Sequence, residues 1–524
     1  MRRYIFLIAL IWLITACGNG ELQENEPEIP APPVIIAEHH QEEYIPQEEP
    51  DEPIPEPVDI PIVNEYFITM EFEPETRTIR GIETVRYTNR TDTTLSELVF
   101  RIPLNAWAPN AIVPVVNMEP ITPYPIEFHN RIFRHGHDYG FMDILHISHD
   151  NEGLDFVLWD TILTITLPRP LEPDETTQLS IQFQASIPKI AHRTGANDHA
   201  VWAGAFLPQE AVFGPNGWHT EPFYPMGSPF ILDVANYTVE ITTPIGYVVA
   251  GTGTKTETYL DDYLITTFTA QMTRDFAFAI SPYFRRSAQV TPSGLVEIVL
   301  YYYTPTLPVD HILNVAVEVI VFFEETIGTY PYPQLSIVET DMFRNAEKFS
   351  SIIFMDSGHM RTSQHLSSLR HEIGHQWFSV IVGSNPIEEA WLNGGLTHFL
   401  QSGLLNYPQD LRTVIEREHS DLMQQMPSIR NENNRRLTTR ISSYETWADY
   451  FRIQHRKAKI MFYALYREMG EGNFRYLLRE YYRRFAFQIA TGEDFRALAE
   501  EIHGSSLDWF FDYWLYTTEL PNLP

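Results

Sequence analysis

Apolar and polar residues alternate along several short segments in the first half of the chain. Residues 66–72 are typical of a strand, residues 163–167 alternate strictly, and residues 237–242 give a third example. Clusters of Pro, Gly, Asn and Asp separate these segments. A period of two places the apolar side chains on one face of a β-strand. The pattern therefore predicts an all-β domain over residues 61–285, built as a saddle or a sandwich.

The pattern changes after Pro282. Residues 296–303, 335–339 and 351–355 are typical of strands, and residues 309–327 have the spacing of a long helix with one apolar face. Helical patterns dominate the rest of the chain, at residues 363–383, 394–405, 408–426, 444–469, 472–486, 492–502 and 507–514. A small sheet followed by helices predicts an α+β, mostly helical second domain over residues 286–524.

The chain begins with Met1-Arg2-Arg3, an apolar run from Tyr4 to Ile14, and then Thr15-Ala16-Cys17. A basic start, a short apolar stretch and small residues before the break are typical of a secretory signal. Cys17 is the single cysteine of the 524 residues, and it stands where a bacterial lipobox carries its lipid. We therefore expect residues 1–17 to be a lipoprotein signal peptide; the alternative is a plain signal peptide with an incidental cysteine. A lipid on Cys17 would anchor the protein to a membrane at the extracytoplasmic face of the bacterial envelope.

Residues 18–60 contain nine Pro, thirteen Asp or Glu, and no Lys or Arg. Such a segment cannot build a core, and its like charges extend it, so we expect a disordered tether. These acidic residues contribute much of the formal net charge of −33. This charge argues against nucleic acid as a partner, because the phosphate backbone would be repelled.

The residues that indicate chemistry are His371-Glu372-Ile373-Gly374-His375. On a helix, this spacing places two imidazoles one turn apart on the same face, where they can share one Zn²⁺. Glu372 would then face a water molecule on the metal and could accept its proton. The alternative is a helix with two ordinary histidines.

The surroundings of this motif resemble a known family. Residues 371–378 followed by Trp391-Leu392-Asn393 look like the membrane alanyl aminopeptidases, peptidase family M1, which are zinc gluzincins. Arg274-Asp275-Phe276-Ala277 is similar to the motif that closes the family's β domain, and the resemblance extends over about residues 62–524. It implies a saddle-like β domain followed by a thermolysin-like catalytic domain, in a short form without the family's long helical C-terminal domain.

The resemblance also implies roles for individual residues. His371 and His375 match two zinc ligands, and Glu372 matches the general base. Glu347 lies in Asn345-Ala346-Glu347-Lys348, where the family has Gly-x-Met-Glu-Asn, so it matches the carboxylate that binds the free amino terminus of a substrate. The Gly, Met and Asn of that motif are absent. Alternatively, Glu347 is a surface carboxylate near the end of a strand.

Two departures from the family pattern concern the reaction centre itself. Gly394 stands where the family has its third zinc ligand, a glutamate, and glycine has no side chain to offer. His455 stands where the family has a tyrosine that stabilises the oxyanion, and an imidazole can still donate a hydrogen bond there. His398 follows Gly394 by one helical turn and is the candidate replacement ligand. The alternative for His398 is packing against a neighbouring helix.

Two functions follow from these residues. The first is a zinc metallopeptidase, aminopeptidase-like, that binds one Zn²⁺ and hydrolyses peptides at the cell surface. In that case Glu372 activates water, His455 stabilises the oxyanion and Glu347 anchors the substrate. The second is a catalytically impaired pseudopeptidase, a surface lipoprotein that binds peptides or acts as a scaffold.

Overall fold

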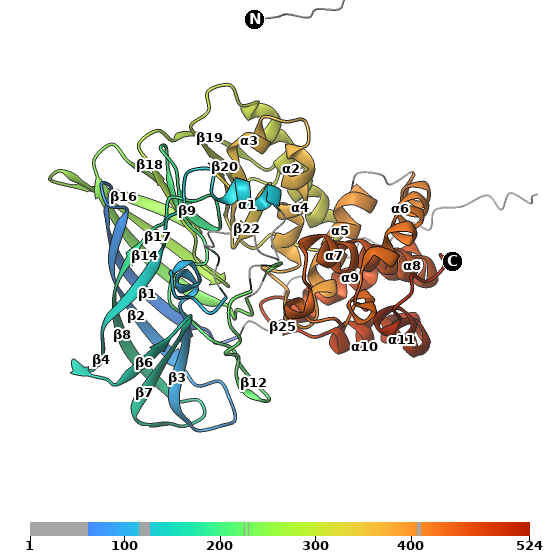
Figure 1. Cartoon of the computed structure of the whole chain (residues 1–524), viewed down its shortest axis with the longest axis horizontal. Helices are drawn as coiled ribbons and strands as arrows, with labels where there is room; N and C mark the ends of the chain where they lie inside the picture. Colours follow the sequence, from blue (N-terminus) through green and yellow to red (C-terminus); the bar gives the residue numbers. More distant parts are fainter. Residues whose placement is uncertain are drawn as a thin grey trace, which may run out of the picture. The chain divides into compact units, whose positions relative to one another are not determined.

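The structure is a computed structural model that describes residues 61–113, 115, 126–224, 226–228, 230–405 and 410–523. The predicted signal peptide, the lipid site at Cys17 and the tether all lie outside the described residues. The described residues belong to one compact unit, with strands in its first part and helices in its second (Figure 1). This arrangement confirms the predicted fold class. The predicted domain boundary at residue 285 stays a prediction.

The largest sheet has eight strands in the order β16-β17-β14-β1-β2-β8-β4-β5. Its strand β1 contains the first alternating segment: Tyr66, Ile68, Met70 and Phe72 are buried, and the residues between them face outward. Apolar faces of this kind hold such a sheet against the rest of the β region. The bounds are β1 Asn64–Glu73, β2 Thr78–Thr88, β4 Phe141–His149, β5 Glu152–Gly153, β8 Thr176–Ser186, β14 Ala235–Pro244, β16 Thr254–Leu260 and β17 Tyr263–Thr273.

Three smaller sheets complete the β region. Their orders are β15-β18-β10-β9, β11-β3-β7-β6 and β12-β13. The predicted strands at 163–167 and 237–242 lie within β7 and β14. The bounds are β3 Leu95–Arg101, β6 Phe156–Trp159, β7 Ile162–Leu171, β9 Thr194–Ala196, β10 Val201–Ala203, β11 Gln209–Glu210, β12 Phe213–Gly214, β13 Gly217–Trp218, β15 Val248–Gly251 and β18 Phe278–Ser281.

A five-stranded mixed sheet opens the second part of the chain, in the order β19-β20-β21-β23-β22. Every residue of β21 and β23 is buried, as expected for central strands covered on both faces. The long helix α2 (Val309–Thr326) begins close to where the sequence predicts it. The strand bounds are β19 Arg285–Val290, β20 Glu297–Tyr302, β21 Gln334–Thr340, β22 Ala346–Phe349 and β23 Ile352–Asp356.

Helices make up most of the remaining chain and gather beside the five-stranded sheet (Figure 1). The predicted helices at 408–426, 472–486, 492–502 and 507–514 correspond to α6, α9, α10 and α11. The bounds are α1 Ile126–Ile132, α3 Ser357–Met360, α4 His365–Trp377, α5 Leu396–Phe399, α6 Leu411–Gln425, α7 Trp447–Tyr450, α8 Ala458–Met469, α9 Glu471–Phe485, α10 Gly492–His503 and α11 Asp508–Tyr516.

Helix α4 ends at Trp377, well before the predicted end at residue 383. The buried side chain of Arg274 explains the difference. Its guanidinium donates to the carbonyl oxygens of Val380 at 2.7 Å and Ile381 at 3.0 Å, in the turn that follows the helix. It also donates to the carbonyl oxygens of Leu232 and Gln488, at 2.8 and 2.7 Å. One side chain of the β region thus fixes the turn that follows α4.

The predicted helices at 394–405 and 444–469 are interrupted by wider π-helical turns. These turns cover Trp391–Gly395, Leu400–Leu405 and Phe451–Lys457. π-helical turns are rare and often occur at functional sites. Gly394 and His455 both lie in such turns, and His398 lies in the short α5 between two of them.

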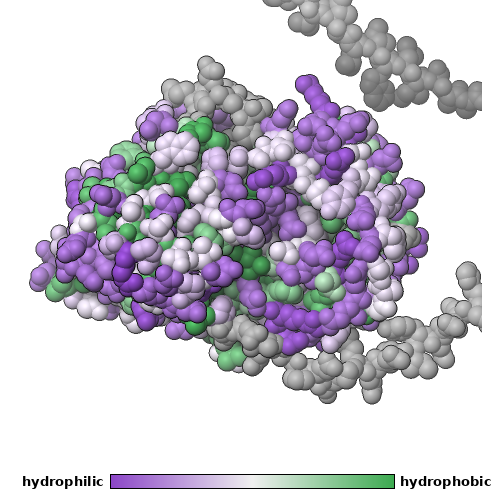
Figure 2. Space-filling model, turned by 90° about the horizontal axis from the view of Figure 1, so that it is seen from below, coloured by the Kyte–Doolittle hydropathy of each residue, from purple (hydrophilic) through white to green (hydrophobic). Residues whose placement is uncertain are grey.

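In the described part of the chain, no helix is both long and apolar enough to span a bilayer. The face shown in Figure 2 is mostly hydrophilic, with scattered apolar patches.

Candidate functional site

Helix α4 brings His371 and His375 together as the sequence predicts. Their Nε2 atoms lie 3.1 Å apart, close to the roughly 3.3 Å expected for two nitrogens that share one tetrahedral zinc ion. The other ring nitrogen of His375 is 3.2 Å from the carbonyl oxygen of Phe378, which fixes the ring orientation. The two imidazoles therefore point at one common position.

The surroundings keep both imidazoles neutral at physiological pH. Burial, with added repulsion from Arg344 and Lys348, lowers the pKa of His371 to about 3. Burial and the positive charge of Lys348 hold the pKa of His375 well below its usual value. Neutral imidazole is the form that binds a metal ion.

Glu372 lines the same pocket as His371. Burial and the negative charge of Glu347 raise the pKa of Glu372 to about 7, although Lys348 and Arg344 oppose this rise. A carboxyl group with a pKa near neutrality can both accept and return a proton. Its position fits the general base that the sequence predicts.

Gly394 and His455 fit together sterically. A Cβ atom on Gly394 would lie 3.1 Å from Cε1 of His455 and 3.4 Å from its Nε2. The imidazole thus occupies space that a side chain at position 394 would need. Its Nδ1 is buried and has no hydrogen-bond partner among the described residues. The two departures from the family pattern therefore lie next to each other in the structure.

The predicted replacement ligand His398 lies near this cluster. The ring centroid of His398 is 5.8 Å from that of His371 and 6.0 Å from that of His455, and the latter two rings are 6.1 Å apart. Nevertheless, in the part of the chain that the structure describes, no three or more His, Cys, Asp or Glu side chains are arranged to hold a metal ion. The two predicted ligands that the structure brings together, His371 and His375, are one fewer than the three protein ligands that a catalytic zinc site normally has.

Glu347 lies in β22 and is surrounded by cations. Its carboxylate oxygens are 3.2 Å from Arg193, 3.8 Å from Arg344 and 4.0 Å from Lys348. These charges keep the pKa of Glu347 below its ordinary value even though burial alone would raise it. The side chain is 6% exposed and borders a separate cavity of about 70 Å³. The predicted role as an anchor for a substrate ammonium stays a prediction, and this environment counts against it.

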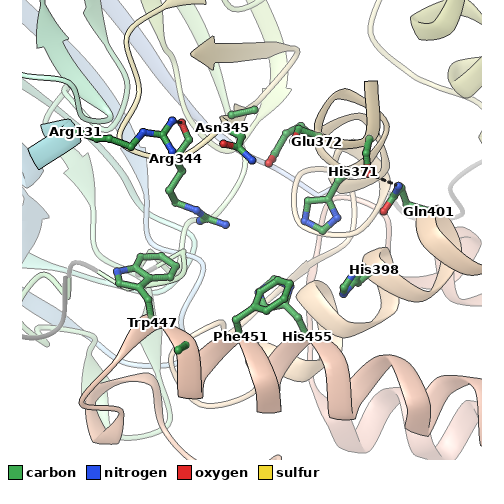
Figure 3. A pocket seen from close by; sticks show the side chains of 14 residues that line it. Arg131, Arg344, Asn345, His371, Glu372, His398, Gln401, Trp447, Phe451 and His455 are labelled. Atoms are coloured by element: carbon green, nitrogen blue, oxygen red, sulfur yellow. Dashed lines mark hydrogen bonds between the residues drawn. The ribbon is translucent and has the colours of Figure 1, made fainter. Parts of the chain in front are cut away.

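The main pocket has a volume of about 460 Å³ and lies between α4, the π-helical turn with His455, and the segment before β22 (Figure 3). Arg344 extends into it between Trp447 and His371. Neither Arg344 nor Trp447 was singled out from the sequence. One signal was available, because Arg344 occupies the position of the glycine in the family's Gly-x-Met-Glu-Asn motif. The pocket is lined by Arg131, Arg344, Asn345, Ala346, Ser367, Ser368, His371, Glu372, His398, Gln401, Trp447, Ala448, Phe451 and His455.

Comparisons with known proteins agree with this geometry. Residues 311–514 match the peptidase family M1 domain. Aminopeptidase Q of Acinonyx jubatus is 25% identical over 206 residues, which are 35% of this chain and 20% of that protein. Aminopeptidase N of Lactococcus lactis subsp. lactis is 22% identical over 41% of this chain and 27% of that protein. The chain thus spans about a fifth to about a quarter of the length of these curated relatives.

Solved structures share the fold. The M1 zinc metallopeptidase from Deinococcus radiodurans superposes with a TM-score of 0.63 at 16% identity, over 88% of this chain and 94% of that one. The superposition on a mutant of that enzyme bound to a Tyr-Ser-Ala substrate gives the same TM-score and covers 96% of the mutant chain. Residues 311–514 therefore form a peptidase family M1 domain, and the described residues share the fold of M1 zinc metallopeptidases.

Proposed function

We propose that this chain binds peptides in the M1 pocket and that its hydrolytic centre is impaired. The observation that carries the proposal is the adjacent pair of Gly394 and His455. A catalytic zinc site normally has three protein ligands and a water molecule. Here position 394 offers no ligand side chain, and a Cβ atom there would make a tight contact of 3.1 Å with the ring of His455.

The amino-terminal anchor is altered as well. A carboxylate that binds a substrate ammonium must offer an unshared negative charge. Glu347 instead shares its charge with Arg193, Arg344 and Lys348. The changed surroundings of Glu347, in addition to those of Gly394 and His455, support loss of the aminopeptidase reaction.

Peptide binding remains compatible with the pocket. Its volume of about 460 Å³ is within the range of ligand sites, and Trp447 and Phe451 give it apolar walls. A structural neighbour was solved with a tripeptide. We therefore assign peptides as the ligand class of this pocket.

A second candidate function is a zinc metallopeptidase, aminopeptidase-like, with a substituted ligand set. The four neighbouring rings of His371, His375, His398 and His455 favour it. In that case Glu372 would accept a proton from water and His455 would donate to the oxyanion. Stoichiometric zinc that is lost in His398→Ala would support this second candidate.

We further propose that the protein is a lipoprotein anchored through Cys17 at the extracytoplasmic face of a bacterial envelope. The support is the signal-like start of the sequence. Incorporation of a labelled fatty acid in a bacterial host, abolished by Cys17→Ser, is the expected result. Equal labelling of the parent protein and of Cys17→Ser would contradict a lipid anchor on Cys17.

The binding function can be tested by calorimetry. Full-length protein is titrated with short peptides in the presence of zinc, and the peptides are then examined by mass spectrometry. The expected result is saturable binding of intact peptide, weakened at least tenfold in Trp447→Ala. Tyr476→Ala, which changes an exposed aromatic residue on α9, is the matched control. Cleavage that disappears in Glu372→Gln would overturn the proposed function.

A further inference from the structure

The main pocket contains a cation that its neighbours do not neutralise fully. Arg344 extends into the cavity (Figure 3), and its side chain is 24% exposed. Its guanidinium lies over the ring of Trp447, 4.7 Å from the ring centroid. The nearest carboxylate oxygen, on Glu347, is 3.8 Å away, beyond hydrogen-bond distance. Arg344 is therefore held in place by an aromatic face and remains available to a ligand.

Glu347 cannot neutralise this cation alone, because three positive side chains share it. Arg193 is the closest at 3.2 Å and is itself buried. Lys348 is the third cation, at 4.0 Å. Three positive charges around one carboxylate leave an excess of positive charge beside the pocket.

The other charged groups of the pocket do not remove this excess. Arg131 pairs with Asp356 at 3.6 Å, and Arg134 also pairs with Asp356, at 2.7 Å. Glu372 is the one carboxylate among the residues that line the pocket, against the two guanidinium groups of Arg131 and Arg344. The pocket is thus positive in a chain with a net charge of −33.

We propose that this pocket selects acidic peptides and binds their carboxylate through Arg344. The inference rests on the proposed peptide-binding function and names its ligand class. A planar guanidinium can donate two parallel hydrogen bonds, one to each oxygen of a carboxylate. The carboxylate comes from an Asp or Glu side chain or from the C-terminus of the peptide. A ligand ammonium is repelled from the same position.

Four synthetic tetrapeptides test this selection on the full-length protein by calorimetry at low salt. They are Ala-Ala-Glu-Ala and Ala-Ala-Gln-Ala, each as the free acid and as the C-terminal amide. We expect at least tenfold tighter binding for a peptide that carries the recognised carboxylate than for its neutral counterpart. The Glu and Gln amides isolate the side chain, and the acid and amide of the Gln peptide isolate the C-terminus. The preference should weaken as salt screens the charges.

Variants at Arg344 identify the residue responsible. Arg344→Gln should abolish the preference, and Arg344→Lys should keep part of it because the charge remains. Arg370→Gln is a matched control, since Arg370 is also 24% exposed and also lies 3.8 Å from a carboxylate, on Glu318, but does not line the pocket. It should leave the preference unchanged.

The outcomes distinguish a failure of the acidic selection from a failure of the proposed peptide-binding function. Equal affinity for all four peptides without cleavage, or a preference that persists in Arg344→Gln, overturns the acidic selection and leaves peptide binding standing. Acidic peptides that are selected and then cut support the selection and overturn the impaired centre. The absence of binding to any of the four peptides overturns both.

Discussion

Replacing Gly394 with glutamate would supply the carboxylate that the M1 family has at this position. The structure predicts that this change alone does not create a zinc site. A Cβ atom at position 394 would stand 3.1 Å from Cε1, 3.4 Å from Nε2 and 3.5 Å from Nδ1 of His455. The imidazole edge therefore meets the new side chain at its first atom. Gly394→Glu together with His455→Ala removes the ring and should let the carboxylate approach His371 and His375.

The expected magnitudes follow from packing. Overfilling a tight site costs about 1–3 kcal/mol, and replacing a helical glycine recovers at most about 1 kcal/mol. Gly394→Glu alone should thus be up to about 3 kcal/mol less stable than the parent protein. The double variant should gain zinc-dependent stability, about 2.7 kcal/mol when free zinc is about a hundredfold above its dissociation constant.

Denaturant unfolding with and without zinc measures both effects. Gly472→Glu is the control for the added charge, because a Cβ atom there meets no neighbour within 4 Å. The steric reasoning is refuted if Gly394→Glu alone keeps the stability of the parent protein and is stabilised by zinc. It is also refuted if the folded double variant does not respond to zinc.

Three further changes test the fold around the site. Glu83 is buried, and both of its carboxyl oxygens lack hydrogen-bond partners among the described residues. Burial raises the pKa of Glu83 well above the ordinary value. The stability that the protonated Glu83 contributes is therefore present at low pH and is lost as the pH rises, at up to about 1.4 kcal/mol per pH unit. Glu83→Gln should thus gain thermal stability over the parent more at pH 8 than at pH 5, whereas exposed Glu71→Gln on β1 should show no such difference. Arg274→Met removes a donor from four carbonyl oxygens, of which those of Ile381 and Gln488 keep a backbone hydrogen bond. It should cost roughly 2–4 kcal/mol of unfolding free energy, and a loss below about 1 kcal/mol would refute its role after α4. Gly395→Ala, whose Cβ would lie 2.3 Å from a side chain of α8, should lose about 1–3 kcal/mol, and unchanged urea unfolding would refute that contact.

Local patterns in the sequence determine much of this fold. The strand predicted at residues 66–72 corresponds to β1 because the apolar residues at every second position, Tyr66, Ile68, Met70 and Phe72, are buried. The long apolar face at 309–327 corresponds to α2. The end of α4 could not be predicted in this way, since it depends on Arg274, more than 100 residues earlier in the chain. The π-helical turns likewise depend on how neighbouring helices pack.

The same distinction applies to the site. The spacing of His371 and His375 is local, and the sequence alone predicts that the two rings meet. The cations around Glu347 include Arg193, which lies 154 residues earlier and is brought close only by the fold. The fit of His455 against Gly394 also joins distant segments, so the sequence shows two substitutions but not that they lie next to each other.

The zinc content of the wild-type protein tests the central claim most directly. Full-length protein is loaded with zinc, dialysed extensively against metal-free buffer, and assayed by atomic emission. With two protein ligands, zinc should be retained at well below one ion per chain. Retention of one zinc ion per chain, lost in His371→Ala, would show that the third ligand exists and would contradict the impaired centre.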